Sequence, residues 1–180
     1  MATKMTGIRK PNISVLGSYS ATAHEQEIAY ALGKGLANLN VNIISGGQKG
    51  VMLSLCKGAH DNRLKEGGTC SIVGILPNSD FDKANPYIDI VIPTGAGSLQ
   101  NIIVPMAGDI VLAIGGSAGT LAEISFAWQN GKKIGLLGNT GWANKLANQC
   151  LDDRRADTMP FFSSVDLAVE WVKLSLSLKL

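Results

Sequence analysis

One stretch of this sequence has residue types and spacing suited to binding an anion. It reads Val111-Leu-Ala-Ile-Gly-Gly-Ser-Ala-Gly-Thr-Leu-Ala-Glu123, an apolar run that ends in glycines and opens a helical pattern. Glycines let backbone N–H groups approach a phosphate with no Cβ in the way, and a helix N-terminus carries about half a positive charge. We expect a phosphate to bind here. The expected contacts are Gly115, Gly116, Ser117, Gly119 and Thr120.

Two side chains of this stretch have alternative roles. The Thr120 hydroxyl either caps the helix or donates to a phosphate oxygen, and both alternatives stay open. Glu123, a carboxylate expected in the first helical turn, either pairs with the helix dipole or faces the ligand. We favour the ligand-facing role for Glu123.

The surrounding elements alternate between strands and helices. Short apolar runs predict strands over 12–17, 41–45, 70–76, 88–92, 109–114, 133–137 and 159–162. Helical spacing of apolar residues predicts helices over 22–39, 51–59, 98–107, 120–130, 142–151 and 164–173. Apolar strands that each lead into a helix imply a parallel sheet covered on both faces. We therefore predict one doubly wound, Rossmann-like α/β domain over residues 1–180, with 1–11 as a flexible tail.

Three more glycine turns follow the predicted strands. A single such turn is weak support for a site, because tight strand-to-helix packing also demands small residues. Four turns at the carboxyl edge of one parallel sheet, however, offer several helix N-termini to an elongated phosphate-bearing ligand. In the second turn, Lys49 either meets a phosphate or projects into water. These turns add Gly17, Ser18, Gly46, Gly47, Gly50, Thr94 and Gly95 to the expected site.

The helix expected over 98–107 follows the Thr94 turn and begins with polar residues. Ser98 is a plausible N-cap, and the amides of Gln100 and Asn101 can hydrogen-bond a polar ligand or simply face water. We include Ser98, Gln100 and Asn101 in the expected ligand site.

Composition narrows the class of protein. Of 180 residues, 46% are hydrophobic and 17% charged, and the net charge of +2 is too small to indicate nucleic acid as the main partner. No apolar run reaches the ~18 residues of a membrane span. Cys56, Cys70 and Cys150 have no CxxC spacing, and His24 and His60 have no metal-ligand neighbours. We expect buried thiols, no metal site and a cytoplasmic location.

The turns at 45–52 and 115–123 together resemble a Rossmann-like family once called lysine decarboxylases, which includes the LONELY GUY phosphoribohydrolases. In those enzymes the second motif reads Pro-Gly-Gly-x-Gly-Thr-x-x-Glu, so Glu123 falls on the catalytic glutamate. Gly115 stands where the family has proline, and Ser117 where it has glycine. No arginine or lysine lies between Val91 and Gln129, although the enzymes carry an arginine there. Its absence argues against hydrolysis, because losing a positioned charge-stabilising group commonly costs ~10²-fold or more in rate.

Within this family the sequence most resembles molybdenum cofactor carrier proteins and their bacterial relatives, through Thr94–Ser98, the Asn101 helix and the Gly-Thr-x-x-Glu turn. The resemblance implies a binding protein that holds molybdopterin-type cofactor as cargo through its phosphate. It also implies a homodimer or homotetramer, which we expect to assemble through helices carrying Trp128 or Trp171, and molybdoenzymes or cofactor-synthesis proteins as partners. Two alternatives remain: a cytokinin-activating nucleoside 5′-monophosphate phosphoribohydrolase that uses Glu123, and a nucleotide sensor.

Overall fold

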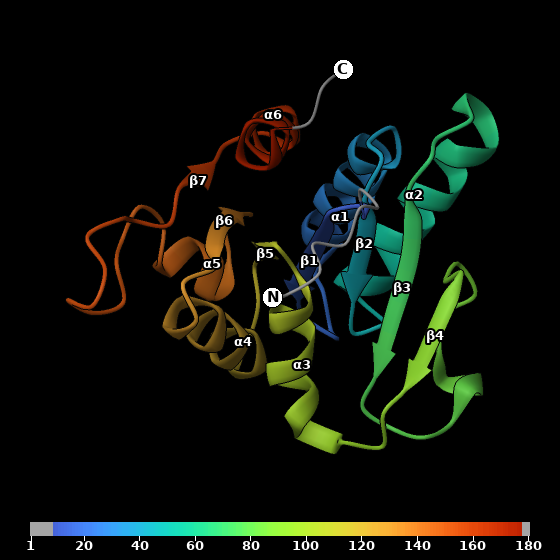
Figure 1. Cartoon of the computed structure of the whole chain (residues 1–180), viewed down its shortest axis with the longest axis horizontal. Coiled ribbons are helices and arrows are strands. Elements are labelled where there is room, and N and C mark those ends of the chain that lie inside the picture. Colours follow the sequence, from blue (N-terminus) through green and yellow to red (C-terminus); the bar gives the residue numbers. More distant parts are fainter. Residues whose placement is uncertain (1–8, 178–180) are drawn as a thin grey trace, which may run out of the picture.

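The computed structural model describes residues 9–177, which form a seven-stranded sheet in the order β4-β3-β2-β1-β5-β6-β7 (Figure 1). Every neighbouring pair is parallel, so all strands end at the same edge of the sheet. The predicted doubly wound α/β class is confirmed. The strands are β1 (Asn12–Gly17), β2 (Asn42–Ser45), β3 (Ser71–Leu76), β4 (Ile90–Pro93), β5 (Ile110–Ile114), β6 (Lys133–Leu137) and β7 (Phe161–Phe162).

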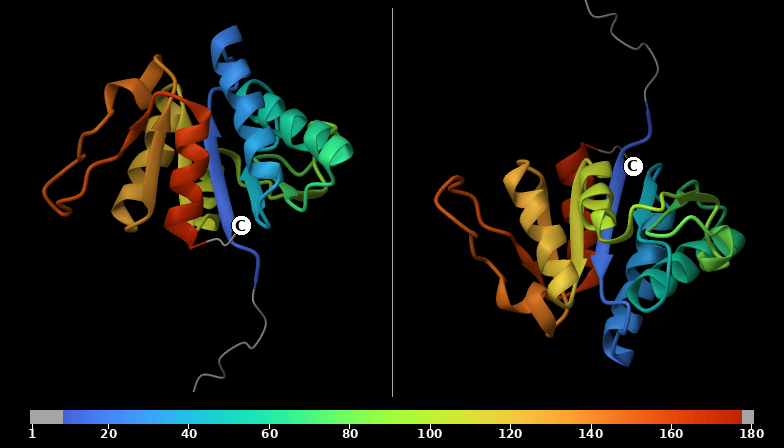
Figure 2. Two further views of the ribbon diagram at one scale, coloured as in Figure 1. Left: turned by 90° about the horizontal axis from the view of Figure 1, so that it is seen from above. Right: turned by 90° about the horizontal axis from the view of Figure 1, so that it is seen from below.

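Helices cover both faces of this sheet, as the two views of Figure 2 show. α1, α2 and α6 lie on one face, and α3, α4 and α5 lie on the other. Two short 3₁₀ helices, η1 (Phe81–Lys83) and η2 (Gly97–Leu99), flank β4. The α-helices are α1 (Ala23–Ala37), α2 (Val51–Glu66), α3 (Gln100–Ala107), α4 (Ala118–Gln129), α5 (Gly141–Lys145) and α6 (Val165–Leu176).

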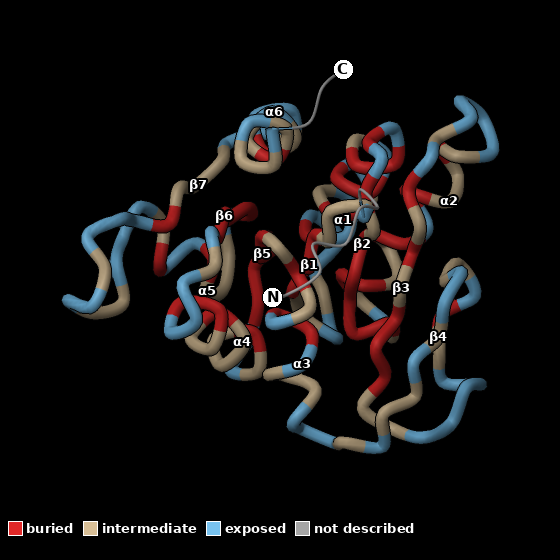
Figure 3. The backbone as a smooth tube through the Cα atoms, in the orientation of Figure 1, coloured by how far each residue is buried: buried red, intermediate tan, exposed pale blue. Residues whose placement is uncertain are grey.

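Successive strand residues point to opposite faces of the sheet and pack into two separate hydrophobic cores. Ile13 and Val15 of β1 pack under α1 and α2, whereas Leu16 packs under α3 and α4. Ser14 is buried on the second side, where its hydroxyl donates to the Val104 carbonyl of α3 at 2.6 Å. Every residue of β5 is buried, and Figure 3 shows the central strands in the buried colour. Burial on both faces explains why these strands read as nearly continuous apolar runs.

Several predicted boundaries were wrong. The helix expected from Ser98 begins at Gln100 after a 3₁₀ turn; Leu99 occupies the N-cap position, so Ser98 does not cap it. The helix expected over 142–151 stops at Lys145. Asn148 then adopts a positive φ of 57°, and its N–H donates to the Met159 carbonyl, so the chain turns back toward β7.

Smaller corrections affect the strands and one cysteine. The strand expected over 88–92 lies at 90–93, and the one expected over 159–162 is only two residues long. Cys56 and Cys70 are buried as expected, but Cys150 is exposed because α5 ends before reaching it.

The two ends of the chain lie partly outside the described residues. Of the tail expected over 1–11, residues 1–8 lie outside, while the Arg9 guanidinium donates to the Asp109 carboxylate at 2.8 Å and Lys10 donates to the Thr69 carbonyl. Over residues 9–177, no helix combines the length and apolar character needed to cross a bilayer.

Candidate functional site

The strand order reverses beside β1. The chain runs outward through β2, β3 and β4 and then returns to place β5 on the other side of β1 (Figure 1). Ligands of doubly wound folds bind in the crevice that such a reversal opens beyond the carboxyl ends of the strands. A cavity of about 160 Å³ lies there, which we call the anion cavity. It is lined by Gly17, Ser18, Tyr19, Gly46, Gln48, Met52, Gln100, Asn101, Ser117, Gly119, Thr120 and Glu123.

The structure brings together expected residues from three of the four turns and from the start of α3. The fourth turn, after β4, does not line the anion cavity. There the Thr94 hydroxyl donates to the Leu76 carbonyl at 2.7 Å, and the Gly95 N–H donates to the Asn78 carbonyl at 3.2 Å. Thr94 and Gly95 therefore bond the end of β3 and the turn after it, and neither they nor Ser98 line this cavity.

Other expected glycines do not line the anion cavity but take backbone conformations that favour glycine. Gly47 and Gly50 have φ values of +70° and +65°, and Gly115 and Gly116 have +57° and +98°. A Cβ on Gly115 would collide with the Glu25 carboxylate. Proline is fixed near φ −65°, so the backbone at Gly115 could not accommodate the family's proline.

Glu25 anchors the Gly115 turn from behind. This buried residue completes a capping box with Thr22: its backbone N–H donates to the Thr22 hydroxyl, and its carboxylate accepts from the Thr22 N–H at 2.8 Å. The same carboxylate accepts from the Thr140 hydroxyl at 2.7 Å. The first N–H groups of α5 bond the carbonyls of Gly115 and Gly116, which fixes the turn from a second direction.

The N-terminus of α4 is open toward the cavity. Ser117 is its N-cap residue, but the Ser117 side chain makes no capping hydrogen bond and the first turn contains no carboxylate. The first backbone N–H groups of a helix have no intrahelical acceptor, so those of Ala118, Gly119 and Thr120 are available to an anion. A Cβ on Gly119 would find only the Asn101 amide nearby, at 3.7 Å, so this glycine leaves open space.

Because α4 begins earlier than the sequence predicted, two expectations change. Thr120 lies inside the first turn and is not the N-cap, so of its two possible roles the capping one was wrong. Glu123 lies in the second turn, so the prediction that placed it in the first turn was wrong. Pairing with the helix dipole fades beyond the first turn and does not explain Glu123.

Glu123 is a half-buried acid without a partner. Its carboxyl group makes no hydrogen bond or ion pair with any residue among 9–177, and burial raises its pKa to about 8. It is therefore protonated at neutral pH, so it adds no negative charge to the cavity and can donate a hydrogen bond. No lysine, arginine or histidine is among the described residues that line the cavity.

The two amides of α3 are not equivalent. The Gln100 Nε2 donates to the Gly46 carbonyl at 3.1 Å and also to the Ile75 carbonyl, so it ties together the ends of β2 and β3. The Asn101 side chain bonds no residue within 9–177. Asn101 is therefore the freer amide for a ligand.

Three lining residues fall outside the expected set. Tyr19 follows Ser18 directly, and Gln48 and Met52 flank Lys49 and Gly50. Only their position next to the predicted glycines could have indicated a role in the site, since their residue types and spacing are equally typical of surface or core positions. Lys49 does not line the anion cavity.

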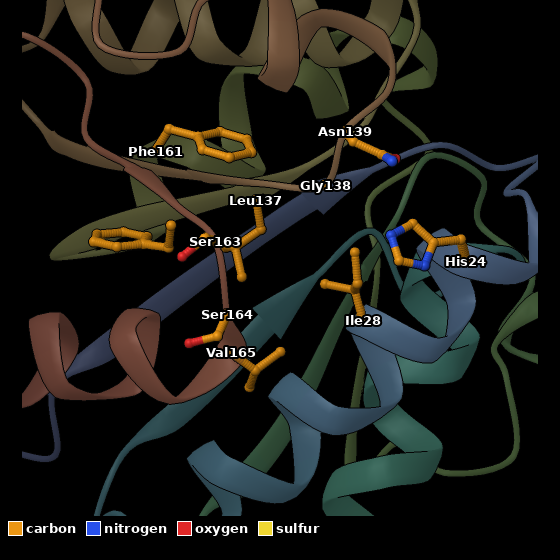
Figure 4. Close-up of a pocket in the computed structure, with 10 residues that line it drawn as sticks. His24, Ile28, Leu137, Gly138, Asn139, Phe161, Ser163, Ser164 and Val165 are labelled. Atoms are coloured by element: carbon orange, nitrogen blue, oxygen red, sulfur yellow. The ribbon is translucent and has the colours of Figure 1, made fainter.

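A separate cavity of about 320 Å³ lies beyond β6, between the N-terminal ends of α1 and α6 (Figure 4). Figure 4 shows His24 and Ile28 of α1 across the cavity from Ser164 and Val165, with Phe161 to one side. None of the expected site residues lines it. The α6 terminus is already capped by Ser164 and carries Asp166 in its first turn, so it suits an anion less well than α4 does.

Solved structures with the same architecture cover nearly the whole chain. The molybdenum cofactor binding protein of Rippkaea orientalis is 29% identical with a TM-score of 0.82, over 94% of this chain and 99% of that one. The molybdenum cofactor carrier protein of Chlamydomonas reinhardtii is 29% identical with a TM-score of 0.79 over the same shares. The DNA processing protein A of Helicobacter pylori, at 15% identity and TM-score 0.58 over 90% and 80%, shares the fold alone.

Sequence comparison adds a relative and a family. An uncharacterised protein of Archaeoglobus fulgidus is 34% identical over 125 residues, which are 69% of this chain and 78% of that protein. The model of the SLOG cluster4 family matches residues 10–166, a span that contains all four glycine turns. The chain belongs to the SLOG cluster4 family, within the Rossmann-like superfamily that its two glycine motifs resemble.

Proposed function

We propose that this protein binds the molybdenum cofactor, a phosphorylated pterin, and carries or stores it without turnover. The observation that carries this proposal is the open, carboxylate-free N-terminus of α4, which meets the anion cavity at the reversal of strand order. The names of two similar structures, a molybdenum cofactor binding protein and a molybdenum cofactor carrier protein, support the choice of ligand.

The cavity suits reversible holding of a phosphate. Backbone N–H groups of Gly119 and Thr120 and the Ser117 hydroxyl supply donors, and a protonated Glu123 adds another without repelling the anion. With no ammonium or guanidinium group among the described lining residues, binding depends on aligned neutral donors. Such a site holds a phosphate without an ion pair that would resist release.

The same lining makes hydrolysis of a nucleoside monophosphate the less favoured function. Cleavage of the glycosidic bond develops charge on both the ribose and the departing base, and preorganised groups must stabilise that charge. Glu123 is the one ionisable group besides Tyr19 in the described lining. We therefore propose binding rather than catalysis.

We further propose that the protein forms a homodimer through α3, and that molybdoenzymes or cofactor-synthesis proteins exchange the cargo with it. The sequence led us to expect assembly through the helices that carry Trp128 or Trp171. The Trp128 side chain itself is only 1% exposed and donates to Asp152, so it packs in the core of its own chain. Large apolar side chains instead lie exposed on β4 and α3 and just before α3. They are Ile90, Ile92, Leu99, Ile103 and Met106.

Loading and transfer test the proposed function. The protein is mixed with cofactor released from a purified molybdoenzyme, and bound molybdenum and pterin are measured after gel filtration. We expect near-stoichiometric loading, transfer to an apo-molybdoenzyme, and no free base released from adenosine monophosphate. Gly119→Val, which fills the open space before α4, should abolish loading and leave the fold intact. Ala156→Val is the control, since it adds a branched side chain at an exposed position that does not line the cavity. Release of base at enzyme-like rates would overturn the proposal.

A further inference from the structure

The anion cavity is too small for the ligand proposed above. Its volume of about 160 Å³ accommodates a phosphate and a few further atoms, whereas pockets for drug-sized ligands span about 300–1,000 Å³. A second cavity of about 500 Å³, which we call the ring cavity, shares Tyr19 and Gln48 with it. The part of an elongated ligand that does not fit in the anion cavity can therefore occupy the adjoining ring cavity.

The ring cavity has fixed walls. One wall is the turn between β2 and α2, and the other is the segment around η1 that the sequence predicted as a polar loop. Asn85 joins the two walls: its N–H donates to the Gly47 carbonyl at 2.9 Å, and its amide nitrogen donates to the Gln48 carbonyl at 3.2 Å. Asn85 is buried, so this connection does not depend on a ligand.

Tyr19 is positioned at the junction by its backbone. Gly50, at φ +65°, lies so close to the carbonyl groups of Ser18 and Tyr19 that a Cβ there would collide with both. The Val51 N–H donates to the Ser18 carbonyl at 3.0 Å. The Tyr19 side chain nevertheless stays 52% exposed and lines both cavities. An exposed aromatic ring on a well-fixed backbone offers a face on which a flat heterocycle can stack.

Building on the proposed function, we propose that one ligand spans both cavities, with its phosphate at the N-terminus of α4 and its pterin ring against Tyr19 in the ring cavity. The Gln48 side chain lies at the junction, where its amide can pair with the donors and acceptors on the pterin edge. The ring cavity is lined by Lys49, Lys83 and Asp82. Lys83 pairs at 3.9 Å with Asp80, which lies outside the lining, whereas Lys49 makes no ion pair among residues 9–177, so a small excess of positive charge remains. That excess favours a ligand with further negative charge beyond its phosphate.

Three probes separate the two subsites: inorganic phosphate, 6-hydroxymethylpterin without phosphate, and cofactor released from a molybdoenzyme. Tyr19→Ala should weaken binding of the pterin and of the cofactor about 10-fold, the scale of a lost stacking contact, and affect phosphate much less, because the expected phosphate donors belong to α4. Tyr19→Phe should retain binding of all three probes. The matched control is Phe81→Ala, because Phe81 is 62% exposed beside the ring cavity and lines neither cavity.

The outcomes distinguish this inference from the function on which it rests. Unchanged pterin and cofactor affinity in Tyr19→Ala would overturn the ring-cavity assignment and leave the carrier function standing. The same would hold if Phe81→Ala weakened binding as much as Tyr19→Ala. Binding of phosphate by the unaltered protein, without binding of either pterin compound, would instead overturn the proposed function itself.

Discussion

Glu123 shows how strongly the surroundings of one side chain set its chemistry. Burial without a partner raises its pKa to about 8 from the ordinary 4.5. Below pH 4.5 the group is protonated in both the folded and the unfolded chain and has no effect on stability. Between pH 4.5 and 8 the unfolded chain releases the proton while the folded chain keeps it, so stability falls as pH rises.

Glu123→Gln should therefore stabilise the protein at high pH. The free energy of unfolding of the variant should match the unaltered protein near pH 4 and exceed it by about 2 kcal/mol at pH 9, less than the full shift implies because Glu123 keeps some solvent exposure. Urea unfolding at both pH values measures the difference. The control is Glu27→Gln on α1, whose side chain is exposed. If the difference in unfolding free energy between Glu123→Gln and the unaltered protein were the same at both pH values, the assigned protonation state would be contradicted.

The same ionisation should govern anion binding. Sulfate is a suitable probe because its own charge stays constant between pH 6 and 9. We expect sulfate affinity to fall as pH rises through about 8, since an ionised Glu123 repels the anion and loses its donor proton. In Glu123→Gln the affinity should stay constant across this range. Calorimetric titrations at pH 6 and 9 test this, and a parallel decline in both proteins would place the titrating group elsewhere.

At the scale of elements, apolar periodicity predicted the succession of strands and helices well but located the start of α4 poorly. Strands such as β1 and β6 were found at their exact bounds, because an apolar run flanked by glycine has few alternatives. The start of α4 was misplaced by two residues, which put Glu123 in the wrong turn and gave Thr120 a capping role. The turn before α4 is held by tertiary contacts, because N–H groups of α5 donate to the Gly115 and Gly116 carbonyls. No local sequence pattern predicts these hydrogen bonds.

Replacing Glu25 tests whether contacts between α1, α5 and the Gly115 turn hold the site in place. Glu25 ties the start of α1 to the N-cap residue of α5 and sits against the Gly115 turn. Glu25→Ala should lower the free energy of unfolding by about 2–3 kcal/mol, through the lost capping box and the lost bond to Thr140. It should also weaken sulfate binding, because the turn before α4 loses its support. Chemical unfolding and the same titrations measure both effects.

A matched change on the same helix controls for loss of a carboxylate. Glu27→Ala removes an exposed acid of α1 and should change stability by less than about 0.5 kcal/mol. If Glu25→Ala were equally mild, the capping box and the link to α5 would not hold the site in place.

At the scale of the whole molecule, the two faces of the sheet are covered unequally. β3 and β4 form one end of the sheet, and the register pairs Ile92 with Ile75, which packs in the core beneath α3 and α4. The exposed side chains of Ile90 and Ile92 therefore point to the face of the sheet that α3 covers, and Ile103 and Met106 are exposed on α3 itself. The sequence predicted the sheet and its helices but could not show which apolar residues the fold would leave uncovered.

The composition of this surface fits a second copy of the chain. From Ile90 to Gly108 no residue is ionisable. A two-fold contact brings the same surface of both chains together, so an uncharged surface meets itself without like-charge repulsion. The segment also contains Gln100 and Asn101 of the anion cavity, so the proposed dimer would place the partner chain near the site. A stable dimer buries about 1,200–2,000 Å² in total.

The double variant Ile103→Glu/Met106→Glu should convert the proposed dimer into a folded monomer, because the two new carboxylates of each chain, four in all, cannot be buried against one another. Sedimentation velocity reports the mass, and circular dichroism verifies the fold. Leu174→Glu on α6 is the control, since Leu174 is 73% exposed yet far along the chain from this surface; it should stay dimeric. If the control dissociated and the α3 variant did not, the subunits would meet through α6. A tetramer that Leu174→Glu reduced to a dimer would instead assign α6 to a second contact, with α3 still forming the first.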